Sequence, residues 1–347
     1  MAHADPVLDT LFLPFAEERL PWPNEDILFL RARAGEGSRP YAKRVLCQQT
    51  FKPDADMLVS AGFSVMEPST PLAPNQNRNV CVLAPRQREE SRALLARAMA
   101  LAAPDGRVIA CASNNEGARS MEDDLRVLSG DNVEVMSKNK GRVCWTQSLQ
   151  SANAALIATW SELDAVRRVC DGRFLSRPGI FAWDRIDVAS ALLAEHLPTN
   201  LSGEAADLGC GFGFLAHELL NKCSQIKSID LYEAEFRALE LARLNLEAYA
   251  GAVKQRFSWH DVTSGLHGEY DVIVCNPPFH VQGRLDRPDI GRRFIAVAAQ
   301  SLKAKGRLWL VANRHLPYEG ELANNFQRVR VVTQAHGFKI IEAQRAA

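Results

Sequence analysis

The chain has 347 residues, more than the roughly 250 to 300 over which a single hydrophobic core grows, so we expect two domains. Its 41 basic and 41 acidic side chains balance, which excludes a strong overall field for a polyanion and leaves any nucleic-acid contact to local patches. The 8 cysteines occur without a Cys-x-x-Cys pair, and no stretch has about 18 uninterrupted apolar residues, so we expect a cytoplasmic protein without a metal site, disulfide framework or membrane span.

The first half of the chain contains a strand, a helix and a second strand, at residues 79–85, 89–103 and 107–111. The first strand runs into Pro85, and the helix ends at the turn Pro104-Asp105-Gly106. The same order recurs in outline at 271–312, which favours two similar domains, although any two α/β segments share this much. We place the connection at 173–185, where Pro178-Gly179 marks a turn.

From about Ala205 onward, apolar runs with the length of strands alternate with longer helical patterns. We predict strands at 205–208, 226–231, 272–275 and 307–312, and helices at 215–220, 236–249 and 294–302. Such alternation is typical of βαβ units around a parallel sheet. The chain is therefore predicted to form two tandem doubly wound α/β domains, residues 1–172 and 173–347.

A glycine turn follows the first strand of the second half. Asp207 precedes three alternating glycines, Gly209, Gly211 and Gly213, with Cys210 between the first two. In a turn between a strand and a helix, glycines let a ligand approach the backbone closely. The spacing is not Gly-x-Gly-x-x-Gly, and the acid suits a ligand with a cationic amino group better than a pyrophosphate. A tight turn without a ligand is the alternative.

Two acids follow the next two strands. Glu233 comes after the second strand, where nucleotide-binding folds place an acid that accepts hydrogen bonds from ribose hydroxyls. Asp230 and Glu235 are rivals for that task, and a solvated carboxylate at a helix start is the alternative. Asp261 is a candidate acceptor for an adenine amino group, or an ordinary loop aspartate.

An amide, a carbonyl and an aromatic ring follow the next strand. Asn276-Pro277-Pro278-Phe279 comes directly after the apolar run at 270–275. In an open α/β sheet, ligands bind outside the carboxyl ends of the strands. An Asn-Pro turn with Phe279 in the core is the alternative. The glycine turn upstream, in an order that brings both motifs to one edge of the sheet, favours a ligand site.

These motifs together resemble the S-adenosylmethionine-dependent class I methyltransferases, and Asn276-Pro277-Pro278-Phe279 resembles their amino-group-methylating branch. The resemblance narrows to the ribosomal RNA guanine-N2 methyltransferases, in particular the small-subunit methyltransferase C family. It is carried by five motifs in the family's order, at residues 178–181, 184–187, 207–213, 276–280 and 313–319. The family pairs a degenerate N-terminal methyltransferase-like domain with an active C-terminal one, which the resemblance implies here.

The resemblance also implies roles for individual residues. The Asn276 side-chain oxygen and the Pro277 carbonyl would accept the N–H bonds of the target amine, so that its lone pair can point at the sulfonium methyl, and Phe279 would stack on the flipped base. Contacts with S-adenosylmethionine are implied for Phe181, Asp207, Gly209, Cys210, Gly211, Gly213, Glu233, Asp261 and Asn276. Arg284 follows the turn closely and could neutralise RNA phosphates, or it could belong to a solvated face offset by Asp286 and Asp289. His280 is a candidate substrate contact or an ordinary loop residue. Arg314, at the end of a strand in the same sheet, is a candidate RNA contact whose role stays open.

Two departures from the family pattern occur near these motifs. Ala182-Trp183 stands where a small polar residue usually follows Phe181, and His280 is separated from Gly283 by two residues. We expect the N-terminal domain not to bind the cofactor, because Ala84-Pro85 lacks the amide and no Gly-x-Gly turn precedes it. Its expected task is RNA docking or support of folding.

The expected activity is methyl transfer from S-adenosylmethionine to the N2 amine of a guanine in 16S ribosomal RNA, free or within a ribosomal subunit, by a monomer. Large-subunit ribosomal RNA is an alternative substrate, because guanine-N2 enzymes of that subunit share the two-domain plan. A protein glutamine amide is a second alternative acceptor, although such enzymes usually have Tyr at the position of Phe279. A non-catalytic RNA-binding assembly factor is the alternative from a different class.

Overall fold

The computed structural model describes residues 5–22, 26–278 and 288–347, and it divides the chain into two compact units. The N-terminal unit comprises residues 1–166 and 177–179, and the C-terminal unit comprises 167–176 and 180–347. The segment at 173–185, where we expected the connection, therefore contributes to both units. Among the described residues, no helix is long and apolar enough to cross a membrane.

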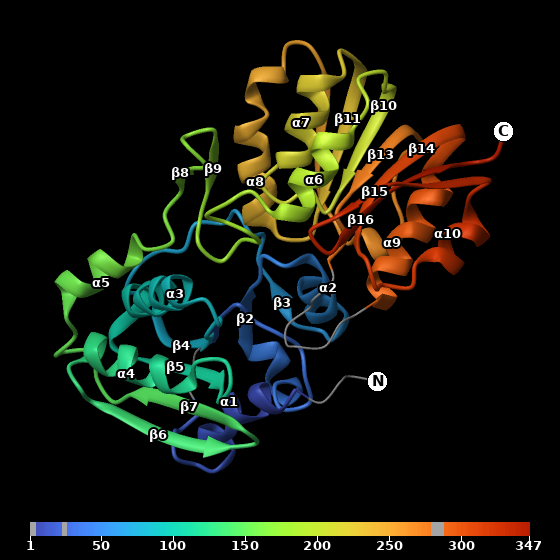
Figure 1. Ribbon diagram of the computed structural model, residues 1–347. Coiled ribbons are helices and arrows are strands. Elements are labelled where there is room, and N and C mark those ends of the chain that lie inside the picture. The colour runs from blue at the N-terminus through green and yellow to red at the C-terminus, as the bar shows by residue number, and fades with distance from the viewer. Residues whose placement is uncertain (1–4, 23–25, 279–287) are drawn as a thin grey trace. The chain divides into compact units, whose positions relative to one another are not determined.

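The C-terminal unit is built on a sheet of 7 strands in the order β12-β11-β10-β13-β14-β16-β15 (Figure 1). The first five are parallel, and β16 runs antiparallel to both of its neighbours. The strands are β10 (Ser202–Leu208), β11 (Gln225–Glu233), β12 (Lys254–Trp259), β13 (Tyr270–Cys275), β14 (Leu302–Asn313), β15 (Arg328–Ala335) and β16 (Phe338–Gln344). A separate hairpin is formed by β8 (Arg167–Val169) and β9 (Phe174–Ser176).

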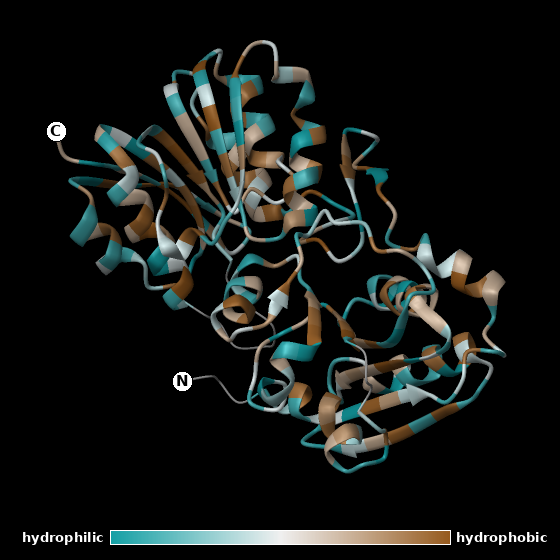
Figure 2. Cartoon of the chain, turned by 180° about the vertical axis from the view of Figure 1, so that it is seen from behind, coloured by the Kyte–Doolittle hydropathy of each residue, from teal (hydrophilic) through white to brown (hydrophobic). Residues whose placement is uncertain are grey.

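Helices cover both faces of this sheet. One face packs against α6 (Val188–His196), α7 (Phe214–Lys222) and α8 (Phe236–Asn245), and the other against α9 (Pro288–Ser301) and α10 (Glu319–Asn325). Two short 3-10 helices, η2 (Glu247–Tyr249) and η3 (Val262–Ser264), complete the unit. Because both faces are covered, the central strands β13 and β14 carry continuous buried runs at 272–275 and 308–312. Figure 2 shows hydrophobic and hydrophilic residues on both the strands and the helices.

The N-terminal unit has a sheet with the equivalent order, β3-β2-β1-β4-β5-β7-β6. Its strands are β1 (Ile27–Leu30), β2 (Val45–Gln48), β3 (Ser64–Val65), β4 (Asn77–Leu83), β5 (Ala102–Ser113), β6 (Val133–Lys138) and β7 (Gly141–Thr146). Its helices are α1 (Pro6–Ala16), η1 (Arg39–Arg44), α2 (Lys52–Ser60), α3 (Arg88–Leu101), α4 (Ala118–Ser129) and α5 (Ala154–Ser161). The prediction of two tandem doubly wound domains is confirmed.

Strand register makes the two units comparable residue by residue. Val82 of β4 pairs with Leu30 and Ala110, as Cys275 of β13 pairs with Leu208 and Leu310. The residue after Cys275 is Asn276, so its equivalent is Leu83, one position before the Ala84 that we had matched to it. The N-terminal unit thus carries a buried leucine in place of the asparagine.

The N-terminal unit also has a Gly-x-Gly sequence after its first strand, so our premise that it has none was wrong. Gly35 and Gly37 follow β1, but both lie against helix α1. A Cβ atom added to Gly35 would lie 2.5 Å from Leu8 Cδ2, and one added to Gly37 would lie 2.9 Å from the Asp9 Cα atom. These glycines therefore serve close packing with a helix, and the space beside them is filled by protein.

The bounds of several elements differ from the predicted ones. Helix α9 begins at Pro288, earlier than the predicted start at residue 294. The predicted turn at Gly106 lies within the bounds of β5, where the pairing with β4 shifts register, and Gly306 lies in the same way within β14, where the pairing with β13 shifts register. The predicted helix at 236–249 ends at Asn245 and is followed by η2.

Candidate functional site

Strand register brings the predicted motifs of the C-terminal unit to one edge of its sheet. Leu208 pairs with Tyr232 on one side and with Cys275 on the other, so the glycine turn, Glu233 and Asn276 leave three adjacent strands together. Strand order reverses between β10 and β13. Open α/β sheets bind their ligands at such a switch point, outside the carboxyl ends of the strands.

The glycine turn has three glycines in the left-handed region, with φ of 71° at Gly209, 54° at Gly211 and 91° at Gly213. The amides of Gly209 and Cys210 both donate to the Tyr232 carbonyl, which fixes the turn on β11. A Cβ atom added to Gly213 would lie 3.2 Å from Ala242 of α8, so this glycine is needed for helix packing. One added to Gly211 would meet nothing within 4 Å. The turn therefore leaves open space beside Gly211.

Asp207 is fully buried beneath this turn. Its Oδ2 accepts a hydrogen bond of 3.0 Å from the Ala216 amide in α7, while its buried Oδ1 has no partner among the described residues. Desolvation raises the pKa of the Asp207 carboxyl to about 8. A buried oxygen without a donor is costly, so this site suits a ligand that brings an N–H or O–H donor, above all a cationic one.

Glu233 ends β11 and faces the turn. Its carboxylate accepts a 2.7 Å hydrogen bond from the Gly211 amide and a 2.8 Å bond from the Glu235 amide. Burial raises the pKa of the Glu233 carboxyl, and these two backbone donors oppose that shift. Of the rivals, Asp230 lies further back in the strand and binds the Tyr270 hydroxyl, and Glu235 caps α8. Of these three acids, Glu233 is thus the one that binds the Gly211 amide.

Asp261 caps η3 after β12. Its Oδ1 accepts from the amide and the hydroxyl of Thr263, at 2.8 and 2.7 Å. The side chain is half-buried at the same sheet edge as Glu233, because Glu233 pairs with Trp259 two residues before it. The carboxylate is thus held in place by the loop itself.

The Asn276 side chain is held from one side only. Its Nδ2 donates to Asp187 Oδ2 at 3.0 Å and to Ser190 Oγ at 2.8 Å, so both amide protons are used. Its Oδ1 is buried and has no hydrogen-bond partner among the described residues. A buried acceptor without a hydrogen bond costs about 1–3 kcal/mol of stability, so a ligand that donates to Oδ1 would bind favourably. The arrangement suits an N–H group of a bound substrate.

Comparisons with known proteins agree with this geometry. The methyltransferase small domain family matches residues 171–342. Proteins named ribosomal RNA small subunit methyltransferase C are 30% identical in Shewanella baltica, over 68% of this chain and 67% of the relative, and 34% identical in Alcanivorax borkumensis, over 63% and 66%. The chain belongs to the ribosomal RNA small subunit methyltransferase C family. The family also includes a Psychromonas ingrahamii protein, 28% identical over 75% of this chain and 74% of that protein.

A solved structure with the same two-unit fold is similar over nearly the whole chain. It is the T. thermophilus 16S rRNA N2 G1207 methyltransferase in complex with AdoMet and guanosine, with a TM-score of 0.81 and 25% identity. The similarity covers 99% of this chain and 93% of that one. The match therefore includes both units and not the C-terminal unit alone.

The remaining residues predicted from the family resemblance are only partly placed. Phe181 is 70% exposed, and Arg314 is exposed just beyond β14 at the edge that carries Asn276. Phe279, His280 and Arg284 lie outside the described residues. Of the motif at 276–280, the structure describes Asn276, Pro277 and Pro278, and the roles of Phe279 and His280 stay predictions.

Sequence reasoning missed the two residues that hold Asn276. Asp187 was noted within a family motif without a role, and Ser190 was not noted at all. A cap signal was present, since Asp187 precedes the apolar helix α6 and accepts from the Ser190 amide. Their contacts with a residue 89 and 86 positions away appear only in the fold.

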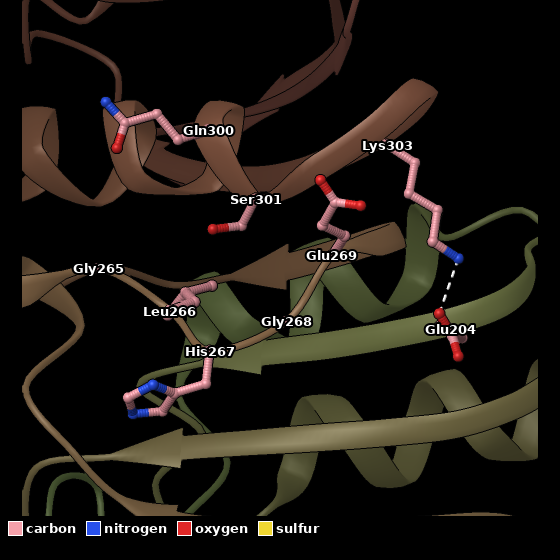
Figure 3. Close-up of a pocket in the computed structure, with 9 residues that line it drawn as sticks. All are labelled: Glu204, Gly265, Leu266, His267, Gly268, Glu269, Gln300, Ser301 and Lys303. Carbon is pink, nitrogen blue, oxygen red and sulfur yellow. Dashed lines mark hydrogen bonds and ion pairs between the residues drawn. The ribbon is translucent and has the colours of Figure 1, made fainter.

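A surface hollow elsewhere in the C-terminal unit is unrelated to these residues. It is lined by Glu204, Gly265, Leu266, His267, Gly268, Glu269, Gln300, Ser301 and Lys303 (Figure 3). Glu204 and Lys303 lie near the starts of β10 and β14, so the hollow opens at the amino edge of the sheet. It lies at the opposite edge from Asn276. No cluster of side chains suited to a metal ion occurs among the described residues.

Proposed function

We propose that this protein transfers the methyl group of S-adenosylmethionine to the exocyclic N2 amine of a guanine in 16S ribosomal RNA. The observation that carries the proposal is the Asn276 amide, whose two protons are both used by the protein and whose buried oxygen has no donor in the part of the chain that the structure describes. The names of the family's members and the guanosine bound by the T. thermophilus relative support the substrate. By the same reasoning, the target is the guanine that this relative methylates.

The chemistry requires an acceptor at this place. The lone pair of an exocyclic amine is delocalised into the base, so the nitrogen is a poor nucleophile. An N–H bond donated to Asn276 Oδ1, and a second to the Pro277 carbonyl, would hold the nitrogen in a more tetrahedral geometry with its lone pair directed at the methyl carbon. An amide cannot keep the proton, so the proton leaves to water after the N–C bond has formed.

The residues around the glycine turn fit S-adenosylmethionine. Asp207 Oδ1 would accept from the cationic amino group, Glu233 from the ribose hydroxyls and Asp261 from the adenine amino group, with the open space at Gly211 admitting the ligand to the backbone. Phe181, Gly209, Cys210 and Gly213 complete the proposed set. When bound, the cofactor supplies an electrophilic methyl on a sulfonium sulfur, which becomes a neutral thioether as the methyl departs.

The N-terminal unit has another task. Leu83 replaces the amide, and α1 fills the space beside the equivalent glycine turn, so this unit is proposed to dock RNA or to support folding. We propose further that the protein acts as a monomer in the cytoplasm, where the ribosome is assembled. Phe279, His280, Arg284 and Arg314 are the proposed contacts to the RNA.

Transfer of labelled methyl from S-adenosylmethionine tests the function directly. The acceptors are naked 16S ribosomal RNA, small ribosomal subunits, large subunits and release factors, and label at a guanine of 16S RNA is expected. Asn276→Ala should lower the rate by about 10²–10³, the range for removing one polar group that stabilises a transition state. Asn325→Ala, which removes an amide at the end of α10, is the matched control with an unchanged rate. Label in protein, or full activity of Asn276→Ala, would refute the proposal.

A further inference from the structure

We infer that Asp187 and Ser190 are positioning residues that fix the orientation of the catalytic amide of Asn276 and so present its oxygen to the substrate amine. The inference rests on the proposed function and deepens it. Both residues lie at the start of helix α6, where Asp187 is the N-cap. Neither is expected to touch the cofactor or the RNA.

An asparagine side chain needs such an external constraint. Its oxygen and its NH2 group have nearly the same shape, so rotation by half a turn exchanges an acceptor for a donor. An NH2 group facing the substrate amine would repel its N–H bonds and leave two donors face to face. The orientation must therefore be decided by the groups on the other side of the amide.

The two neighbours decide it. Asp187 Oδ2 lies 3.0 Å from Asn276 Nδ2, and a carboxylate oxygen accepts hydrogen bonds but does not donate them. Ser190 Oγ lies 2.8 Å from the same nitrogen and is 8% exposed, so water does not readily replace it. Because the Asp187 carboxylate can only accept, Nδ2 must face it, and Ser190 Oγ accepts the second proton. Among the described residues nothing donates to Oδ1, which is therefore left for the substrate. The carboxylate also polarises the amide, which makes Oδ1 a stronger acceptor while positive charge develops on the attacking nitrogen.

The N-terminal unit provides an internal comparison. Its helix α1 corresponds to α6, with Asp5 as the N-cap in place of Asp187. Three residues after the cap, Leu8 stands where α6 has Ser190, and Leu83 stands where β13 is followed by Asn276. Leu8 and Leu83 belong to one buried hydrophobic cluster.

The comparison separates two roles of the aspartate. The amide and the hydroxyl are replaced together by two leucines, whereas the capping carboxylate is present in both units and pairs with Arg33 in the N-terminal one. Capping alone therefore explains an aspartate at this position but does not explain Ser190. Ser190 is present only in the unit that has Asn276, because the serine hydroxyl binds the asparagine amide.

A double-mutant cycle in the full-length protein tests the inference. Ser190→Ala removes one acceptor without touching the cap, and we expect a single-turnover methyl-transfer rate about fivefold to tenfold lower, the effect of one hydrogen bond. The dissociation constant of S-adenosylmethionine should stay unchanged. In the Asn276→Ala background, Ser190→Ala should have no further effect, because there is no amide left to orient. Asp187→Ala, assayed well below its melting temperature, should lower the rate further than Ser190→Ala does. It should likewise leave cofactor affinity unchanged and have no further effect in the Asn276→Ala background.

The matched control is Ser301→Ala. Ser301 is 7% exposed, as buried as Ser190, and lies at the other edge of the same sheet (Figure 3). Its rate should equal that of the wild type. A wild-type rate in Ser190→Ala, or a loss of rate that persists undiminished in the Asn276→Ala background, would overturn the positioning role. Failure of the proposed function would look different, since the wild-type protein itself would then not methylate ribosomal RNA or Asn276→Ala would be fully active.

Discussion

Gly211→Ala is predicted to weaken cofactor binding in addition to a modest loss of stability of the fold. Gly211 has φ of 54°, and a Cβ atom there would meet nothing within 4 Å, so its cost to the free protein is the strain of the left-handed conformation alone. That strain is about 1–2 kcal/mol. For a unit of this size it corresponds to a fall in melting temperature of about 2–8 °C.

The cost to binding has a different origin. The methyl group would occupy the open space into which the cofactor is proposed to fit, and one methyl too many in a packed site costs about 1–3 kcal/mol. Since each 1.4 kcal/mol is about a tenfold change in affinity, the dissociation constant of S-adenosylmethionine should rise by about fivefold to 140-fold. Isothermal titration calorimetry measures it directly.

Two other glycines of the same unit serve as comparisons. Gly172 in the β8–β9 hairpin has φ of 79° and open space around a Cβ atom, so Gly172→Ala should lose similar stability and bind the cofactor normally. Gly213→Ala adds a contact of 3.2 Å with Ala242 to the strain and should lower the melting temperature more than either. Wild-type affinity in Gly211→Ala would refute the assignment of the turn to the cofactor. Equal stability of Gly213→Ala and Gly172→Ala would refute the packing role of Gly213.

Two further predictions concern buried charge. Because burial raises the pKa of Asp207 to about 8, the folded protein binds a proton that the unfolded chain has lost, so the ligand-free protein should lose stability as pH rises from about 4 to 8. Asp207→Asn should flatten this decline in melting curves and weaken cofactor binding, and parallel curves would contradict the assignment. Lys339, 3% exposed, donates to the Leu316 carbonyl and to Glu319, so Lys339→Met should cost about 1–3 kcal/mol in denaturant unfolding by leaving that carbonyl unpaired. An unchanged unfolding midpoint would show that the loop after β14 does not depend on Lys339.

Local sequence determined the motifs and the order of strands and helices along the chain. Three predicted strands end next to the residues Asp207, Glu233 and Asn276. In a parallel sheet, the carboxyl ends of such strands meet at one edge. The duplication was visible for the same reason, since both halves repeat strand, turn, helix and strand. Its register was not, because an apolar strand end at Leu83 looks the same in sequence whether it is shifted by one residue or not.

Only the tertiary structure decided how the amide of Asn276 is oriented. An asparagine after a strand supplies an amide oxygen and an NH2 group, but the sequence does not show which of the two faces the substrate. That depends on acceptors at the start of a helix 86 to 89 residues away. The same holds for Gly35 and Gly37, whose sequence suggests a ligand turn and whose space is taken by α1. Sequence thus determined the chemical groups at this edge of the sheet, while packing over long sequence separations decided which of them were left free to act.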